Sequence, residues 1–251
     1  MYFQSHSIII KNTDYREKDK LVTVFSEKQG KHKAIARGIK KPGSSLRASV
    51  QPFCSSLLFF SSGRELDLIT QGRLIDFFAN SREDINRTLY SVYIMELLDK
   101  ALMDRVPMPQ LFGITLSVLE FINNQGINPL ILRYFEMQLI VELGFKPELN
   151  YCTNCGQRIS TYKGFSLANG GMICARCASE DDKCIVLAGE VIGLLRLLID
   201  GEINTLQRVR ATTPALHQLE LFLGRYLEYH LERHFNLKST ISKIDKGRSA
   251  W

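Results

Sequence analysis

The spacing of four cysteines constrains this chain more than any other feature of its sequence. Cys152-Thr-Asn-Cys155 is separated by 18 residues from Cys174-Ala-Arg-Cys177. Two residues between paired cysteines allow one tight turn to direct both sulfurs at a single ion. The linker falls within the range of about 15–20 residues that is typical of zinc sites built from two such pairs. We therefore expect one structural zinc ion, bound by Cys152, Cys155, Cys174 and Cys177.

An alternative interpretation is that these four cysteines are free or redox-active thiols. A redox motif of the thioredoxin type would contain one pair at a strand-to-helix junction, whereas this segment contains two pairs. A closed shell of four sulfurs leaves no position for water, which argues against metal catalysis. Residues 150–184 include few aliphatic side chains, so we expect the metal to supply the folding free energy of this segment. Cys54 and Cys184 are expected to lie outside the site, with Cys54 buried in a core.

The rest of the composition is that of an ordinary globular protein, with 251 residues of which 45% are apolar and 23% are charged. No apolar stretch approaches the roughly 20 residues that a membrane-spanning helix requires. The first residues lack a basic segment followed by an apolar one, so we expect no secretory signal. These features predict a soluble, cytoplasmic protein, and in that compartment six cysteines do not indicate a disulfide framework.

The first 80 residues alternate short β-type runs with turn residues. Five strands in this length, with no helical pattern before residue 81, predict a small barrel of the OB type. An SH3-like barrel would give nearly the same number of strands, so the barrel type stays open at this point. The predicted strands cover residues 7–11, 21–26, 32–37, 53–60 and 66–78.

The pattern changes at Ser81, where Ser81-Arg-Glu-Asp84 resembles a capping box at the start of a helix. Helices are predicted from there to about residue 103, over residues 111–122, 129–143 and 191–199, and from Thr213 to about Phe235. We therefore predict an α+β chain with a barrel domain over residues 1–80 and a helical domain over residues 81–251. The zinc module, at about 150–184, is inserted in the helical domain. The polar tail, residues 238–251, is expected to fray, and its last three residues resemble the start of a purification tag.

Positive charge is concentrated in the barrel segment. Residues 1–78 contain 13 lysines and arginines against 7 aspartates and glutamates. Residues 28–47 contain no acidic residue, and a flexible basic loop beside a sheet suits a phosphate backbone. A solvated basic face is the alternative, but OB-type barrels frequently bind single strands. We therefore expect residues 1–80 to bind nucleic acid through Lys28, Lys31, Lys33, Arg37, Lys40, Lys41 and Arg47.

Several short stretches of the chain match one family of proteins. They are Ile8-Ile-Ile-Lys-Asn-Thr-Asp-Tyr15, Glu17-Lys-Asp-Lys-Leu-Val-Thr23, Ala36-Arg-Gly38, Gln51-Pro-Phe53 and Pro147-Glu-Leu-Asn150, the last of which leads into Cys152. Along nearly its whole length the chain resembles the RecO family of bacterial DNA repair and recombination mediator proteins. The resemblance implies an N-terminal OB-fold, a helical bundle and a zinc-binding module inserted in that bundle. Some relatives lack the metal cysteines, all four of which are present here.

The resemblance also implies a function that is not catalytic. RecO-like proteins bind single- and double-stranded DNA, anneal complementary strands and act together with RecR. They bind the acidic C-terminal tail of the single-stranded DNA-binding protein (SSB) and help to load RecA, which makes RecA an indirect partner. For this chain the resemblance implies a cytoplasmic, nucleoid-associated protein that responds to DNA damage and has no membrane partner.

One position in the third predicted helix matches a family arginine that is linked to the SSB tail. Arg133 is the only cation in the largely apolar stretch 130–136. An arginine beside an apolar groove suits both a C-terminal carboxylate and a buried aromatic side chain. The alternative is that Arg133 pairs with Glu136, one turn along the same helix.

No residue pattern indicates an enzyme. The five histidines show no nucleophile motif, and His230 and His234 do not follow the zinc-protease pattern, in which a glutamate comes directly after the first histidine. No glycine-rich lysine loop for phosphates is present, so ATP use is not expected. Two functions remain. One is a DNA-binding recombination mediator, and the other is a zinc-ribbon interaction module whose basic barrel binds an acidic protein partner.

Overall fold

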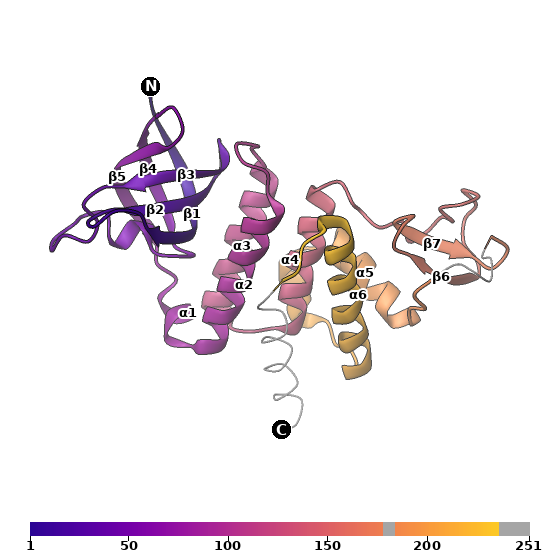
Figure 1. The fold of residues 1–251 in the computed structure, drawn as a ribbon. Helices are drawn as coiled ribbons and strands as arrows, with labels where there is room; N and C mark the ends of the chain where they lie inside the picture. Colours follow the sequence, from indigo (N-terminus) through magenta and orange to yellow (C-terminus); the bar gives the residue numbers. More distant parts are fainter. Residues whose placement is uncertain (178–183, 236–251) are drawn as a thin grey trace. The chain divides into compact units, whose positions relative to one another are not determined.

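The computed structural model describes residues 1–177 and 184–235, which form two compact units (Figure 1). The first unit comprises Met1–Ile127 together with Phe235, and the second comprises Asn128–His234. The basic tail, residues 238–251, lies outside the described residues, so its predicted fraying stays a prediction. Every helix in the described part of the chain is too short or too polar to span a membrane.

Five strands at the N-terminus close into a barrel with the neighbour order β1-β2-β3-β5-β4. β3 and β5 are parallel, whereas every other neighbouring pair is antiparallel. β1 pairs with β4 through its first half and with β2 through its second half, which closes the barrel. The expectation of five N-terminal strands is confirmed, and they are β1 (Tyr2–Asp14), β2 (Lys20–Ser26), β3 (Gly30–Ala36), β4 (Ser55–Ser61) and β5 (Asp67–Asp76).

Alternation along the strands directs one face of each strand into the barrel. In β3, for example, Ala34 and Ala36 are fully buried while Lys33 is exposed. Cys54 also lies in this core, as the sequence predicted. Ile39 and Leu46, from the segment between β3 and β4, also belong to this core and are only 3% and 7% exposed. The loop that carries much of the positive charge is therefore anchored at two points.

Three helices follow the barrel in the first unit: α1 (Ala79–Glu83), α2 (Ile85–Ala101) and α3 (Pro109–Gln125). The structure corrects the predicted helix start. Asp84, not Ser81, is the N-cap of α2, because its carboxylate accepts the backbone N–H groups of Asn86 and Arg87. The ring of Phe112 in α3 contacts the rings of His6 and Phe25, so α3 packs against β1 and β2.

The second unit contains three α-helices and a small hairpin. α4 (Pro129–Glu142) begins as predicted, with the Asn128 side chain accepting the N–H of Leu130 and Pro129 at the first helical position. The last helix ends before the predicted Phe235, because Glu232 adopts a left-handed conformation with φ of 50°. The other elements are β6 (Tyr162–Ser166), β7 (Gly171–Cys174), α5 (Gly189–Asp200), the 3-10 helix η2 (Ile203–Arg208) and α6 (Thr213–Leu231).

The antiparallel hairpin of β6 and β7 is anchored to α6 by aromatic side chains. Phe165 of β6 is fully buried, and its ring centroid lies 4.9 Å from that of Phe222 and 5.5 Å from that of Tyr226. The Tyr226 hydroxyl donates a hydrogen bond to the carbonyl of Phe145 at 3.1 Å. Burial raises the pKa of Tyr226 to about 12, so this hydroxyl keeps its proton at neutral pH.

Candidate metal centre and nucleic-acid interface

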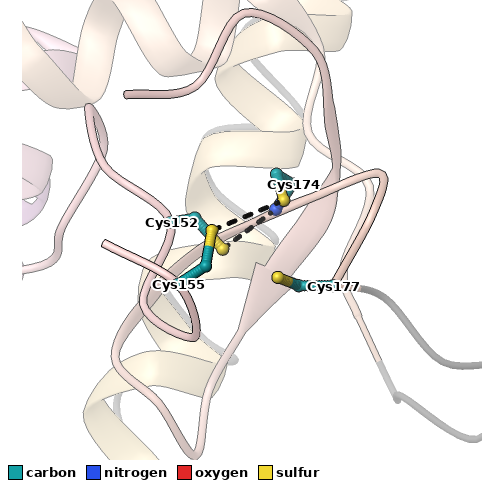
Figure 2. A group of neighbouring side chains, drawn as sticks. All are labelled: Cys152, Cys155, Cys174 and Cys177. Carbon is teal, nitrogen blue, oxygen red and sulfur yellow. Dashed lines mark hydrogen bonds between the residues drawn. The ribbon is translucent and has the colours of Figure 1, made fainter. Parts of the chain in front are cut away.

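The first cysteine pair lies in a tight turn that precedes the hairpin. The N–H of Gly156 donates to the carbonyl of Cys152 at 2.8 Å, and the N–H of Cys152 donates to the carbonyl of Gln157 at 2.9 Å. Gly156 has φ of 70°, a left-handed conformation that glycine adopts at little cost. These bonds fold the segment from Cys152 to Cys155 back on itself, so that both sulfurs belong to one turn (Figure 2).

The second pair lies at the end of the hairpin. Cys174 is the last residue of β7, and the N–H of Cys177 donates to its carbonyl at 3.1 Å. The N–H of Cys174 donates to Sγ of Cys152 at 3.4 Å, which links the two turns directly. Figure 2 shows the sulfurs of the two turns facing one another.

The distances between these sulfurs are suitable for a metal ion. All four Sγ atoms lie within 4.8 Å of one another, and those of Cys155 and Cys174 are 4.0 Å apart. Four sulfurs at about 2.3 Å from a tetrahedral ion would be about 3.8 Å apart. No disulfide joins any of the six cysteines. The structure therefore brings the four sequence-predicted cysteines together into a candidate metal site.

Close backbone packing around Gly171 holds the two turns together. A Cβ atom on Gly171 would lie 2.5 Å from Cγ2 of Thr153 and 2.8 Å from the carbonyl oxygen of Glu148. Only glycine fits there without a shift of the first turn. A small apolar cluster supports the same region, in which Ile159 and Cys184 pack around Cys152, Ile173 and Cys174.

The thiols of the cluster differ in acidity even without an ion. Burial disfavours the thiolate of Cys152, but backbone N–H groups, that of Cys174 first, outweigh burial and lower its pKa to about 6. The backbone N–H of Cys177 lowers the pKa of Cys174. The neighbouring sulfurs, that of Cys155 first, raise the pKa of Cys177 to about 12. Four thiolates thus repel one another unless a cation lies between them.

The seven sequence-predicted basic residues lie on β3 and on the two connections that flank it. Lys28 lies in the turn between β2 and β3, while Lys31 and Lys33 belong to β3 itself. The other four lie in residues 37–47, which we call the basic loop, and are Arg37, Lys40, Lys41 and Arg47. Because Ile39 and Leu46 anchor this loop in the barrel core, its cations are held beside the sheet.

Two of the seven cations are already paired with carboxylates. Nζ of Lys31 lies 3.4 Å from Asp104 and donates to the carbonyl of Asp99, and the side chain is only 12% exposed. Nζ of Lys40 lies 2.9 Å from Oδ2 of Asp14, and this hydrogen bond lowers the pKa of Asp14. Within residues 1–177 and 184–235, the remaining five are exposed and form no ion pair, and they are Lys28, Lys33, Arg37, Lys41 and Arg47.

A second connection lies beside the basic loop. In the β1–β2 loop (residues 15–19), Oδ1 of Asp19 accepts the N–H of Gly38 at 2.8 Å, and the carbonyl of Lys18 accepts the N–H of Lys40 at 3.2 Å. Arg16 and Lys18 are exposed and thereby extend the basic surface. Neither is among the seven sequence-predicted basic residues. The polar run 14–20 between two strands was the sequence signal for these two residues. No local pattern, however, indicates that this run approaches the basic loop.

Arg133 lies in α4 and is only 4% exposed. Its Nη1 donates to both carboxylate oxygens of Glu136, at 3.1 Å and 2.8 Å. This is the pair that the sequence offered as the alternative to a role in binding the SSB tail. A role of Arg133 in binding a partner stays a prediction.

A closed barrel with a basic surface, followed by helices and a four-cysteine hairpin, defines an α+β protein with a candidate metal centre and a candidate nucleic-acid interface. Comparison with known proteins agrees with this description. The family model described as "Recombination protein O N terminal" matches residues 1–78, and that described as "Recombination protein O C terminal" matches residues 82–240. The chain belongs to the RecO family.

Individual relatives match over nearly their full length. A DNA repair protein RecO of Syntrophomonas wolfei is 53% identical over 247 residues, which cover 98% of each chain. The protein of the same name from Desulforamulus reducens is 36% identical over 98% of this chain and 96% of its own. That of Oceanobacillus iheyensis is 36% identical over 95% of this chain and 92% of its own.

Proposed function

We propose that this RecO-family protein is a DNA-binding recombination mediator in DNA repair and performs no catalysis. It binds single- and double-stranded DNA, anneals complementary strands and, with RecR, helps to load RecA onto strands coated with SSB. The names of the relatives, all DNA repair proteins, support the repair role. The place of action is then the bacterial cytoplasm, at the nucleoid.

The observation that carries DNA binding is the group of five exposed cations on and beside β3. Each lysine or arginine that meets a phosphate releases condensed counterions, so a cluster of cations without carboxylate partners favours a polyanion. The strand order β1-β2-β3-β5-β4 supports a barrel of the OB type, which often binds single strands. Residues 1–80 are then the nucleic-acid-binding domain, and residues 81–251 are the helical domain.

For the cysteine cluster we propose one structural zinc ion bound by Cys152, Cys155, Cys174 and Cys177. Thiolates are soft ligands that favour Zn²⁺ over hard cations such as Mg²⁺. With four protein ligands the ion has no open position, so its contribution is to hold the two turns of residues 150–184 together. The backbone N–H groups that lower the pKa of Cys152 and Cys174 help these thiolates to form at neutral pH.

We also propose that Arg133 belongs to a binding site for the SSB tail, because this residue matches a family position linked to that tail. The Arg133–Glu136 pair adds a condition to that proposal. A C-terminal carboxylate of the tail must share the guanidinium with Glu136 or replace it, because Arg133 already donates to both oxygens of that carboxylate. The RecR contact and the loading of RecA rest on family membership alone.

A second candidate is a zinc-ribbon interaction module whose basic barrel binds an acidic protein. The pairing of Lys40 with Asp14 and of Lys31 with Asp104 favours it, since carboxylates already bind this part of the barrel. In that case the exposed cations would meet aspartates and glutamates of the partner rather than phosphates.

One experiment separates the two candidates. The affinity of the full chain for a naked single strand is measured over a series of salt concentrations. Annealing of complementary strands is followed with and without SSB. A steep loss of affinity with salt, together with faster annealing, supports the mediator. Binding to an acidic protein combined with no binding to naked strands would support the interaction module.

A further inference from the structure

We propose that Tyr15 is a stacking platform for an unpaired base, placed beside the basic loop so that the barrel surface prefers single-stranded to double-stranded DNA. The inference rests on the proposed function, because it assumes that phosphates meet the basic loop. It adds a residue that contacts the base and a reason for strand preference.

The position of Tyr15 relative to the basic loop is fixed by backbone hydrogen bonds. Within the β1–β2 loop, the N–H of Tyr15 donates to the carbonyl of Asp19, and the N–H of Asp19 donates to the carbonyl of Arg16, both at 3.3 Å. The same loop receives the N–H groups of Gly38 and Lys40 from the basic loop. The two loops are therefore joined, and Tyr15 is the first residue of the β1–β2 loop.

The Tyr15 ring is available to a ligand, whereas most aromatic rings near the basic stretch are not. Tyr15 is 41% exposed, while Phe25, Phe53 and Phe60 are at most 3% exposed and fill the interior of the first unit. The guanidinium carbon of Arg16 lies 5.2 Å from the Tyr15 ring centroid. Because this guanidinium lies over one face of the ring, a base stacks on the opposite face, and the cation also attracts the adjoining phosphate.

The charges around Tyr15 favour a polyanion after the internal pairs are considered. Asp14 is paired with Lys40, and Asp19 accepts the N–H of Gly38, so two of the three carboxylates in residues 14–19 are engaged. The third, Glu17, is exposed. Exposed cations adjoin Glu17 in its own loop (Arg16 and Lys18) and occur in the basic loop that this loop contacts (Arg37, Lys41 and Arg47). A strand whose phosphates follow these cations brings its bases to the Tyr15 ring.

Strand preference follows from which bases can reach the ring. In a duplex each base is paired and stacked between its neighbours, so its face is not available to a side chain. The phosphates of a duplex still meet the basic loop. Tyr15 therefore contributes to the binding of single strands and not to that of duplexes.

The test uses three probes, of which two are single strands that carry the same charge and differ only in their bases. Binding of the full chain to a fluorescent oligothymidylate, to an abasic oligomer of equal length and to a duplex is measured by anisotropy. We expect Tyr15→Leu to weaken oligothymidylate binding by about 5- to 150-fold, the range that one base stacked on an aromatic side chain is worth. Affinity for the abasic oligomer and for the duplex should not change, and Tyr15→Phe should retain the wild-type preference.

Tyr2→Leu is the matched control, because Tyr2 is 80% exposed and lies at the opposite end of β1 from the β1–β2 loop. It should leave all three affinities unchanged. Equal losses for the oligothymidylate and the abasic oligomer in Tyr15→Leu would overturn the inference, as would an unchanged oligothymidylate affinity. Failure of the wild-type chain to bind any of the three probes would instead overturn the proposed function.

Discussion

Nη2 of Arg105 lies 2.8 Å from Oδ2 of Asp67, so the connection between α2 and α3 supplies the cation for a carboxylate at the start of β5. The Asp67 side chain is only 1% exposed, whereas that of Arg105 is 48% exposed. The N–H of Arg105 also donates to the carbonyl of Lys31 in β3 at 2.7 Å. This connection therefore joins β3 and β5, the parallel pair of the barrel.

Replacement of Arg105 should destabilise the first unit. Arg105→Ala leaves the buried carboxylate of Asp67 without its cation, and we expect the free energy of unfolding to fall by about 1–3 kcal/mol. Arg105→Lys keeps the charge and should lose less. Urea unfolding measures the change, and an unchanged midpoint in Arg105→Ala would show that the pair contributes nothing to stability.

Stability should decrease in mild acid because of His32. Its Nε2 lies 3.8 Å from the same Asp67, and burial lowers the pKa of His32 below its ordinary value of 6.5. The unfolded chain then binds the proton more readily than the folded protein, so the His32 contribution is complete above pH 6.5 and is lost as pH falls through the folded pKa. His32→Gln should flatten the dependence of unfolding free energy on pH in this range. Identical slopes for the two proteins would contradict the assignment to His32.

The purified protein should contain one zinc ion per chain. Cys174→Ser should lose the metal and lower the stability of residues 150–177, because three sulfurs cannot close the shell. Cys184→Ser is the control, since this thiol packs beside the cluster but is not among its four ligands. Metal analysis provides the measurement. Full zinc retention in a Cys155→Ser, Cys174→Ser double variant would exclude this site.

Two cations of the basic loop should determine the salt dependence of DNA binding. Lys41→Glu combined with Arg47→Glu should weaken binding to all sequences and reduce the slope of log K against log salt by about 0.7 for each lost phosphate contact on a single strand. Lys31→Ala should lower stability but leave that slope unchanged, because Lys31 is paired with Asp104 and mostly buried. The same slope in wild type and in the folded double variant would mean that the loop is a solvated face.

A test of Arg133 must separate partner binding from stability. Arg133→Ala alone removes the cation that donates to Glu136, which is fully buried, and loss of one partner from a buried pair costs about 3–5 kcal/mol. We therefore expect the informative variant to be Arg133→Met with Glu136→Met, which removes both charges. It should weaken binding of an SSB tail peptide by roughly 1.5–3 kcal/mol and leave naked-DNA binding intact. Normal peptide binding in that variant would assign Arg133 a structural role only.

Local patterns were sufficient to predict the five barrel strands and the five longer helices, but not α1, η2 or the strands β6 and β7. Alternating residues such as Val22 and Val24, separated by turn residues, predict the strands, and Pro129 after Asn128 predicts the start of α4. Both signals act over a few residues, so sequence alone reveals them. The start of α2 was placed wrongly at Ser81 because two polar residues in the same turn, Ser81 and Asp84, can each cap a helix.

The candidate sites were predictable only in part, for the same reason. The four cysteines could be grouped because a metal imposes a spacing on the sequence. The approach of Asp19 to Gly38 and the pairing of Lys31 with Asp104 depend on how distant segments pack, and no local pattern encodes either contact. Sequence reasoning could therefore not show that Lys31 lies in an ion pair, nor that the loop carrying Arg16 contacts the basic loop.

The contact of Phe165 with Phe222 and Tyr226 bears on the order in which parts of this chain become stably folded during translation. All four cysteines leave the ribosome well before α6, which carries both of the aromatic partners of Phe165. Domains fold as the chain emerges, so the nascent hairpin gains its apolar support only near the end of translation, and the proposed zinc ion would be its earlier source of stability. If the proposed site binds zinc, a cell starved of zinc would accumulate incomplete chains in which Phe165 is exposed and open to aggregation or proteolysis.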